Sequence, residues 1–410
     1  MLPQLERYHS LVPLDTNHRK STYCFNYQSW LYKAKNSKNG RLYALRRLEG
    51  AIQRVICPSP TSLIQDPGYR LTNEHAIQAV MKEWKRIKNP CIVTVHEIFT
   101  SREFGDSSLI FAYDYHPLSK TLYELHFQQS SGPRYKTGPI AEETLWGYIC
   151  QITTALKAIH SHKLAARCLE LSKIIADGKR IRLAACSILD VVQYEAGAQK
   201  PMQELQQEDL VKFGKLMLSL ATNQLPGHLN VQTALESLNT KYSQSLQEAI
   251  AWLINPSAVD DAKNIEHFIG GIALQMTKFF DFALHESDDT KSHLSRELEN
   301  GRVARIMAKL HAVNDHPFLQ NWSETANRYS LKLFCDYVFH QVDKDGKPYV
   351  SLGHMLTCIN KLDAGIEELV PLTSPDNQSS VIISYRELKN MLERSFNELL
   401  KQSRSPSVPQ

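Results

Sequence analysis

No apolar run in the 410-residue sequence reaches roughly 18 residues, the length that a membrane-spanning helix needs. No basic segment followed by an apolar stretch stands at the N-terminus, so the sequence gives no sign of a secretory signal. The formal charge of +4 is small for this length and does not point to a nucleic acid or a membrane surface as partner. We therefore expect no membrane partner and a cytoplasmic location.

Cysteine pairs at metal-binding spacing are also missing, because the sequence contains no C-x-x-C. Scattered cysteines fit the reduced thiols of an intracellular protein better than a disulfide framework or a zinc site. We therefore expect no metal site. The eight cysteines are Cys24, Cys57, Cys91, Cys150, Cys168, Cys186, Cys335 and Cys358.

The apolar pattern predicts an α+β fold. Residues 23–25, 29–34 and 41–48 are rich in aromatic and aliphatic side chains and are separated by turn signals, which is typical of a strand meander. A helix follows, with apolar side chains at three- and four-residue steps: Ile77, Val80, Met81, Trp84 and Ile87. Two further strands, a linker and a mainly helical remainder give residues 1–257 the element order of a bilobal protein-kinase-like fold. Residues 51–68, with three prolines and little periodicity, are interpreted as an inserted surface loop.

Three strings carry a resemblance to the protein kinases. Residues 43–47, YALRR, stand where kinases have the V-A-I-K of their third strand. Residues 89–93, NPCIV, resemble H-P-N-I-V, and Asp209 with Gly214 resembles the D-x-W-S-x-G of the central helix in the large lobe. Their order and spacing favour the kinase-like frame over some other α+β domain, which is the alternative.

In the first lobe, the groups that hold phosphates in a kinase are replaced. Kinases use a glycine-rich loop and a Lys–Glu pair. Here residues 24–29 contain no glycine, so the backbone cannot close over phosphates in the usual way. Arg46 replaces the lysine, and Val80 stands at the position of the glutamate.

In the second lobe, the catalytic base and the metal ligands are replaced as well. The H-R-D triplet reads Ala-Arg-Cys at 166–168, Lys173 replaces the metal-binding asparagine, and D-F-G reads Ala-Cys-Ser at 185–187. Losing every element in one frame predicts a pseudokinase that is not an enzyme. A thiol enzyme with Cys168 as nucleophile and His160 or His162 as its partner is an alternative, although an isolated cysteine is more often a small buried hydrophobe.

Nucleotide binding without a metal is still compatible with these residues. Guanidinium groups suit phosphate oxygens, and a lysine ammonium can take over the electrostatic role of a metal cation. The alternative is a solvated linker with ordinary surface charges. The candidate nucleotide-binding residues are Arg46, Arg47, Asp114, Tyr115, His116, Pro117, Leu118, Ser119, Lys120, Thr121, Ser172 and Lys173.

A stripe at coiled-coil spacing follows the kinase-like region. Its steps of four and three residues predict a coiled coil over residues 258–296 and a homodimer, although a helix packed on its own lobe gives a similar stripe. Gly270-Gly271 interrupts the stripe and predicts a bend or a close approach of another backbone. The candidate seam residues are Ile265, Ile269, Ile272, Met276 and Phe279.

The last hundred residues predict a separate, compact domain. Apolar periodicity marks three helices within residues 297–402, around Leu331, Leu356 and Leu392. Residues 403–410, SRSPSVPQ, have the composition of a disordered tail.

Five strings narrow the resemblance to one family. They are LRRLEG at 45–50, YRLTNE at 69–74, FAYDYHPLSKT at 111–121, LENGR at 298–302 and LGHML at 352–356. With these strings the whole chain resembles the regulatory pseudokinase subunit of the poly(A)-nuclease deadenylation complex. Residues 51–68 depart from the family pattern, which runs RLEG and YRLTNE together. The N-terminal region of the family, with its zinc finger and its motif for poly(A)-binding protein, is not in this sequence.

The resemblance implies a function. It implies a non-catalytic subunit that binds ATP without hydrolysing it, dimerises through the coiled coil and grips the catalytic exonuclease subunit with a C-terminal knob domain. It further implies recruitment to mRNA poly(A) tails through poly(A) RNA, poly(A)-binding protein and tryptophan-bearing silencing factors, in the cytoplasm and in P-bodies. The alternatives are an unconventional protein kinase and a scaffold or RNA-binding module that never meets nucleotide.

Overall fold

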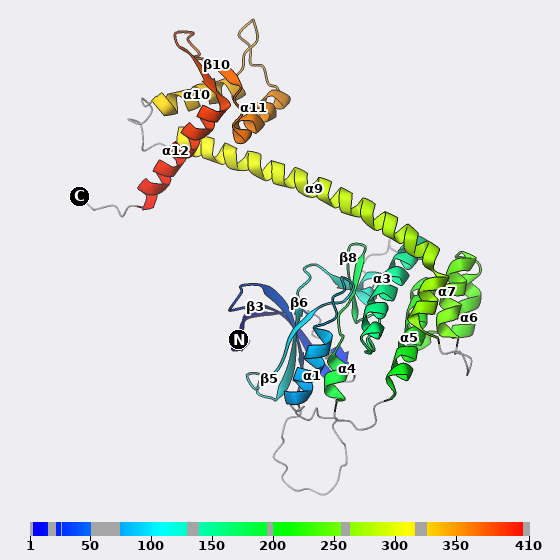
Figure 1. The fold of residues 1–410 in the computed structure, drawn as a ribbon. Coiled ribbons are helices and arrows are strands. Elements are labelled where there is room, and N and C mark those ends of the chain that lie inside the picture. Colours follow the sequence, from blue (N-terminus) through cyan, green and yellow to red (C-terminus); the bar gives the residue numbers. More distant parts are fainter. Residues whose placement is uncertain are drawn as a thin grey trace. The chain divides into compact units, whose positions relative to one another are not determined.

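An antiparallel six-stranded sheet forms the first lobe of the computed structural model, in the order β1-β3-β4-β6-β5 with β2 paired to β3 (Figure 1). The strands are β1 Tyr8–Pro13, β2 Thr22–Cys24, β3 Tyr27–Asn36, β4 Leu42–Leu48, β5 Val95–Ser101 and β6 Ser108–Asp114. Helix α1, Glu74–Trp84, buries Ile77, Val80, Met81 and Trp84 in the core shared with one face of the sheet. Strand alternation gives the other face its own smaller apolar cluster, around Tyr32, Tyr43 and Ile110.

The structure describes residues 3–14, 22–25, 27–50, 74–128, 139–194, 200–255, 263–315 and 326–404. The predicted inserted loop at 51–68 lies outside these ranges, as do residues 405–410 of the predicted tail. Within the described ranges, none of the helices combines the length and the apolar character that crossing a membrane requires.

The second lobe is mainly helical and carries a small sheet in the order β7-β8-β9. One apolar core runs through both lobes, from Leu48 and Ile77 to Leu253. The elements are β7 Lys120–Thr121, α2 Leu122–His126, α3 Glu142–Ser161, β8 Ile174–Asp177, β9 Arg180–Leu183, α4 Ile188–Val192, α5 Met202–Thr222, the 3-10 turn Pro226–His228, α6 Val231–Leu238, α7 Gln244–Ile254 and α8 Ile265–Gly271. This arrangement is the bilobal α+β fold that the sequence predicts.

The predicted seam begins on the kinase-like unit itself. Ile265 and Ile272 are buried in its core, Ile269 and Met276 are half-buried against that core, and the ring of Phe279 lies beside Gly147 of α3. The helix is broken where the two glycines predict a bend, because α8 ends at Gly271 and α9, Ala273–Asn314, begins two residues later. Within one chain, these five residues therefore pack on the kinase-like lobe, which is the alternative to the predicted coiled-coil seam.

The chain divides into two compact units, Met1–Phe282 and Ala283–Gln410. The second unit packs the end of α9 against a three-helix cluster and a hairpin, around Leu310, Phe334 and Leu388. Its elements after α9 are α10 Ala326–Phe339, α11 Leu352–Ala364, β10 Leu369–Thr373, β11 Ser380–Ser384 and α12 Tyr385–Arg404. The three predicted helices are present, the hairpin is additional, and α9 runs without a break across the predicted boundary at residue 297.

Candidate nucleotide-binding cleft

A buried aspartate on α5 holds the loop that corresponds to the kinase catalytic loop. Asp209 is 1% exposed and accepts hydrogen bonds from the backbone N–H of Ala166 at 2.6 Å and of Arg167 at 2.7 Å. Its Oδ2 also lies 3.1 Å from Nε2 of His160 at the end of α3. These contacts are those of a side chain that anchors the loop, as the resemblance of Asp209 to the central-helix aspartate of kinases predicts.

The loop presents a thiol where a kinase presents its base. Cys168 is fully buried, and its Sγ lies 3.5 Å from Sγ of Cys186 in the segment after β9. Arg167, with a left-handed backbone (φ 60°), turns its guanidinium to Asp190 at 3.5 Å and to Gln193. The side chain at this position of the loop is therefore a buried thiol that contacts a second thiol.

Lys173 lies directly before β8 and close to the β2–β3 turn. The side chain is only 5% exposed, and its Nζ lies 5.8 Å from the ring centroid of Phe25 at the β2–β3 turn. Its backbone donates to the carbonyl of Glu170 and accepts from the N–H of Ala184, each at about 2.9 Å. The neighbouring Ser172 is exposed. An ammonium group thus stands below the turn that covers the phosphates in kinases.

The two arginines of β4 lie on opposite faces of the sheet. Arg46 is 9% exposed, and its guanidinium reaches Oγ of Ser29 at 3.4 Å while its Nε is buried without a hydrogen-bond partner. Arg47 is held on the other face by Asp106 at 2.9 Å and by Ser108 at 2.6 Å. The expectation that both arginines reach phosphates is corrected for Arg47, because neighbouring residues of a strand point to opposite faces.

In the linker between the lobes, Asp114 and His116 already form hydrogen bonds with other residues of the chain. Oδ1 of Asp114 lies 2.6 Å from Nε2 of His96, and this hydrogen bond lowers the pKa of Asp114. Burial and the nearby charge of Arg182 lower the pKa of His116. The carbonyl of His116 accepts a hydrogen bond from Ser119 at 2.9 Å.

The later candidates of the linker have structural roles of their own. Thr121 caps helix α2 in a reciprocal pair with Glu124, and Lys120 belongs to β7, which pairs with β8. Pro117 is exposed, and Leu118 is 96% exposed. Residues 114–116, which directly follow β6 and include Tyr115, therefore remain the linker segment nearest the cleft.

Two contacts at the cleft were missed by sequence reasoning. Tyr113 is buried, and its hydroxyl donates to the carbonyl of Cys186 at 2.8 Å. Burial raises the pKa of this hydroxyl well above its usual range. The indole of Trp84 bonds to Asp190. The alternation of β6 could have placed Tyr113 on the cleft face, whereas the Trp84 contact has no local sequence signal.

No cluster of three or more His, Cys, Asp or Glu side chains suited to a metal ion occurs in the described part of the chain. Arg46 and Lys173 are both buried cationic side chains of the candidate site. Guanidinium and ammonium groups bind phosphate oxygens directly.

Comparison with known proteins identifies close relatives of the whole chain. A family model described as the Pan3 C-terminal knob domain matches residues 265–399. The chain is 61% identical over 410 residues to the PAN2-PAN3 deadenylation complex subunit PAN3 of Chaetomium globosum, covering 98% of this chain and 60% of that protein. The chain thus spans about 60% of the length of the curated relatives it matches.

Solved structures agree with the fold of the chain. The PAN3 chain in a complex of Neurospora crassa PAN2 (WD40-CS1) with PAN3 (pseudokinase and C-term) is 52% identical, with a TM-score of 0.79 and coverage of 97% of this chain and 94% of that one. The Drosophila melanogaster PAN3 pseudokinase is 35% identical, with a TM-score of 0.75 and coverage of 97% and 99%. The predicted kinase-like fold is confirmed by these likenesses, and the proteins that carry it are named pseudokinases.

Proposed function

The chain belongs to the family of the PAN2-PAN3 deadenylation complex subunit PAN3, and from this premise we propose that it is a non-catalytic, nucleotide-binding adaptor of a deadenylase. In this role it binds ATP without hydrolysing it, forms a homodimer and holds the catalytic exonuclease subunit, the counterpart of PAN2, at mRNA poly(A) tails. The role includes contacts with poly(A) RNA and with tryptophan-bearing silencing factors, in the cytoplasm and in P-bodies.

The observation that carries this proposal is a loop that Asp209 anchors as in a kinase, but whose side chains are not carboxylates at the positions expected for the base and the metal ligand. Asp209 fixes the backbone of residues 166 and 167, as a working catalytic loop requires. The side chains that this scaffold positions are a buried thiol at 168 and an ammonium group at 173. A frame that is maintained while its proton acceptor and metal ligands are replaced is suited to binding rather than phosphoryl transfer.

ATP binding is supported by the orphaned donor of Arg46. A buried guanidinium nitrogen without a partner carries a desolvation cost that a phosphate oxygen would offset. Lys173 supplies a second cation on the opposite side of the cleft, where kinases place a metal ligand. Because neither contact needs a metal ion, we expect ATP to bind in the presence of a chelator.

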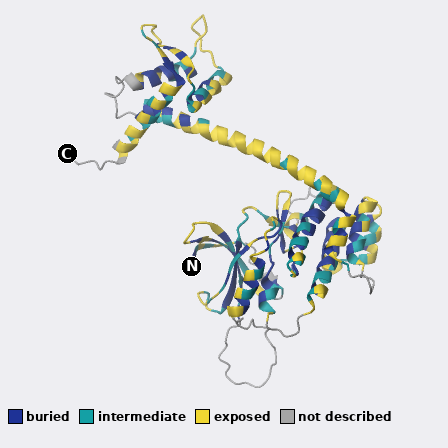
Figure 2. Ribbon diagram, viewed as in Figure 1, coloured by how far each residue is buried: buried dark blue, intermediate teal, exposed yellow. Residues whose placement is uncertain are grey.

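Dimerisation is supported by the apolar residues of α9 beyond the seam residues that pack on the first unit, where the helix is exposed along most of its length (Figure 2). Phe280, Leu284, Leu294 and Leu298 are between 51% and 64% exposed. Together with Ser287 and Lys291 they follow steps of four, three, four, three and four residues, the repeat of a coiled coil. A long helix with such a stripe gains stability by pairing with a second copy.

Binding of the exonuclease subunit is supported by the C-terminal unit. The turn before α11 and the start of that helix expose an apolar surface, which comprises Val342, Tyr349, Val350, Leu352 and Leu356. Each of these side chains is at least 42% exposed, and apolar surface of this kind usually marks a protein interface. The solved Neurospora complex places PAN2 with a PAN3 chain that includes this C-terminal region.

Two measurements on the full chain test the proposal. Calorimetry with ATP in EDTA should show saturable heat, and an absence of heat would leave the scaffold without nucleotide as the better account. Co-purification with the PAN2 counterpart should succeed for the full chain and fail for a chain that ends before residue 283. Metal-dependent phosphate transfer by a homogeneous preparation, lost in Lys173→Ala, would instead favour the unconventional kinase.

A further inference from the structure

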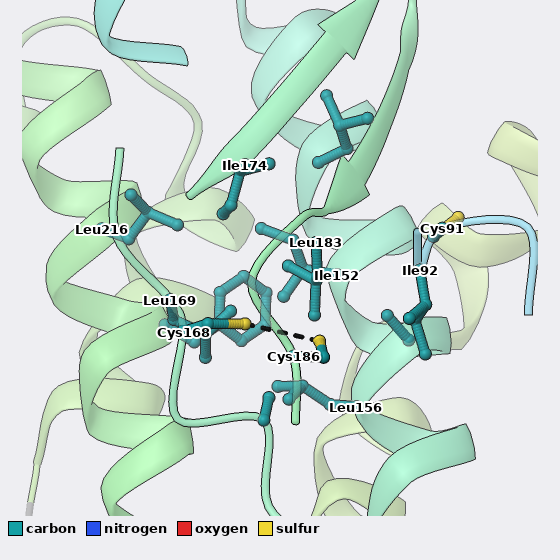
Figure 3. Packing of buried hydrophobic residues seen from close by; sticks show 14 of the residues in the cluster. Cys91, Ile92, Ile152, Leu156, Cys168, Leu169, Ile174, Leu183, Cys186 and Leu216 are labelled. Carbon is teal, nitrogen blue, oxygen red and sulfur yellow. Dashed lines mark hydrogen bonds between the residues drawn. The ribbon is translucent and has the colours of Figure 1, made fainter. Parts of the chain in front are cut away.

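Two thiols face each other beneath the cleft. Sγ of Cys168 and Sγ of Cys186 are 3.5 Å apart, although the residues are 18 positions apart in the sequence (Figure 3). One comes from the loop after α3 and the other from the segment after β9, and both side chains are at most 2% exposed. The close approach therefore joins the two segments that carry the H-R-D and D-F-G motifs in kinases.

Backbone contacts hold both segments in place. Asp209 binds the N–H groups of residues 166 and 167, directly before Cys168. The hydroxyl of Tyr113 binds the carbonyl of Cys186. These contacts fix the two backbone segments beside each other, and their thiols meet between them.

The surroundings favour an uncharged pair. Ile152, Leu156, Leu169 and Leu183 lie around the two thiols (Figure 3). The neighbouring thiol and burial raise the pKa of Cys186 well above its usual range. A neutral disulfide can replace two thiols in this apolar site without burying a charge.

We propose that Cys168 and Cys186 are an oxidation site at which hydrogen peroxide converts the dithiol into an intrachain disulfide. One sulfur attacks the peroxide as its thiolate, the S–O bond of a sulfenic acid forms, the O–O bond breaks, and hydroxide leaves with the thiol's proton as one water. The second sulfur then attacks the sulfenic sulfur, the S–S bond forms, the S–O bond breaks, and hydroxide leaves with the second thiol's proton as another water. Two electrons pass from the dithiol to peroxide in total.

The geometry allows the bond with a small movement. A disulfide has an S–S distance of about 2.05 Å, so the sulfur atoms must approach by about 1.5 Å. Side-chain rotation and a slight shift of residues 185–187 provide that movement. The product would tie the loop at 166–168 to the segment below Tyr113 and fix the floor of the cleft.

The test uses the full chain and maps its disulfides. The folded protein is treated with hydrogen peroxide, the remaining thiols are blocked with N-ethylmaleimide in denaturant, and the digest is analysed by mass spectrometry. We expect a peptide pair joined through Cys168 and Cys186, which disappears after reduction with dithiothreitol. The control Cys335→Ala, altered in the second unit, should keep this pair, and Cys168→Ala should lose it.

A second experiment shows whether the fold selects this cysteine pair or whether peroxide joins cysteines at random. Peroxide treatment of the chain in urea should give mixed pairings among all eight cysteines, in contrast to the single pairing of the folded chain. Blocked thiols at both positions after peroxide treatment of the folded chain, or sulfinic acid at either one without a cross-link, would overturn the proposal. This mapping needs no variant, so a poorly folding Cys168→Ala does not weaken it.

Discussion

Trp84 donates its indole N–H to the carboxylate of Asp190 over 2.7 Å, across 106 positions of sequence. The bond joins α1 of the first lobe to α4 of the second. In kinases, a Lys–Glu pair holds the corresponding helix to the sheet. Val80, which the sequence pattern places at the position of that glutamate, is buried in the core. The helix is therefore held from below by Trp84 and by apolar packing.

Replacing Trp84 with Phe should destabilise the first unit. Burial already raises the pKa of Asp190, and loss of the indole removes one of the hydrogen bonds that this buried carboxyl accepts. We expect a loss of about 1–3 kcal/mol in the free energy of unfolding, measured by urea denaturation. Trp146→Phe is the matched control, because its partner Glu142 lies nearer the surface. Equal losses in both variants would contradict the role assigned to the Trp84 bond.

The two arginines of β4 should differ in nucleotide binding. Arg46→Ala removes the guanidinium on the cleft side, so ATP affinity should fall about ten- to a hundredfold, the range for a lost hydrogen bond to a charged group. Arg47→Ala breaks the contacts with Asp106 and Ser108 and should lower stability while leaving ATP affinity unchanged. Calorimetry with ATP measures the affinity of each variant. If Arg47→Ala lowered ATP affinity more than Arg46→Ala does, the assignment of Arg46 rather than Arg47 to the nucleotide side of the sheet would be wrong.

The exposed stripe, and not the buried seam, should control the dimer. Leu294→Asp with Leu298→Asp puts charges on the exposed side of α9, so we expect a monomer of unchanged helical content. Light scattering gives the mass, and circular dichroism gives the helical content. Ile272→Asp is the contrast, because Ile272 is 4% exposed in the chain's own core and its replacement should unfold the first unit. A dimeric double variant would remove this stripe from the interface.

Gly214 of α5 should tolerate no larger side chain. A Cβ at this position would lie 2.6 Å from Cγ1 of Ile254 and 2.8 Å from Cβ of Leu253. Gly214→Ala should therefore cost about 1–3 kcal/mol through overpacking. Gly301→Ala in α9 has no neighbour within 4 Å and should instead stabilise the helix by about 0.5–1 kcal/mol. Thermal denaturation of both variants checks the two opposite signs.

The pair of His96 and Asp114 should make stability depend on acid. The hydrogen bond lowers the folded-state pKa of Asp114 below the ordinary value of 3.8. Because the unfolded state then binds the proton more readily, this contribution is fully present above that value and is lost as pH falls through the folded-state pKa. Replacing His96 with Asn should therefore cost most stability at neutral pH and little in strong acid. A difference that grows on acidification would contradict the assignment.

The sequence by itself predicted a pseudokinase. That prediction comes from Ala166, Cys168, Lys173 and Cys186, which stand where the predicted kinase frame would have its base and metal ligands. The repeat of apolar residues likewise predicted α1 and the helices of the last unit, because one buried face imposes a period of 3.6 on a local segment. Strand alternation could also have separated Arg46 from Arg47.

Only the tertiary structure decided which distant residues meet. The thiols of Cys168 and Cys186, the bond from Trp84 to Asp190 and the hold of Asp209 on its loop all depend on chain segments that no local pattern brings together. The same is true of the seam, since Ile272 at a heptad position fits a partner helix or the chain's own core equally well. A periodic pattern specifies that a face is buried, and packing alone determines what buries it.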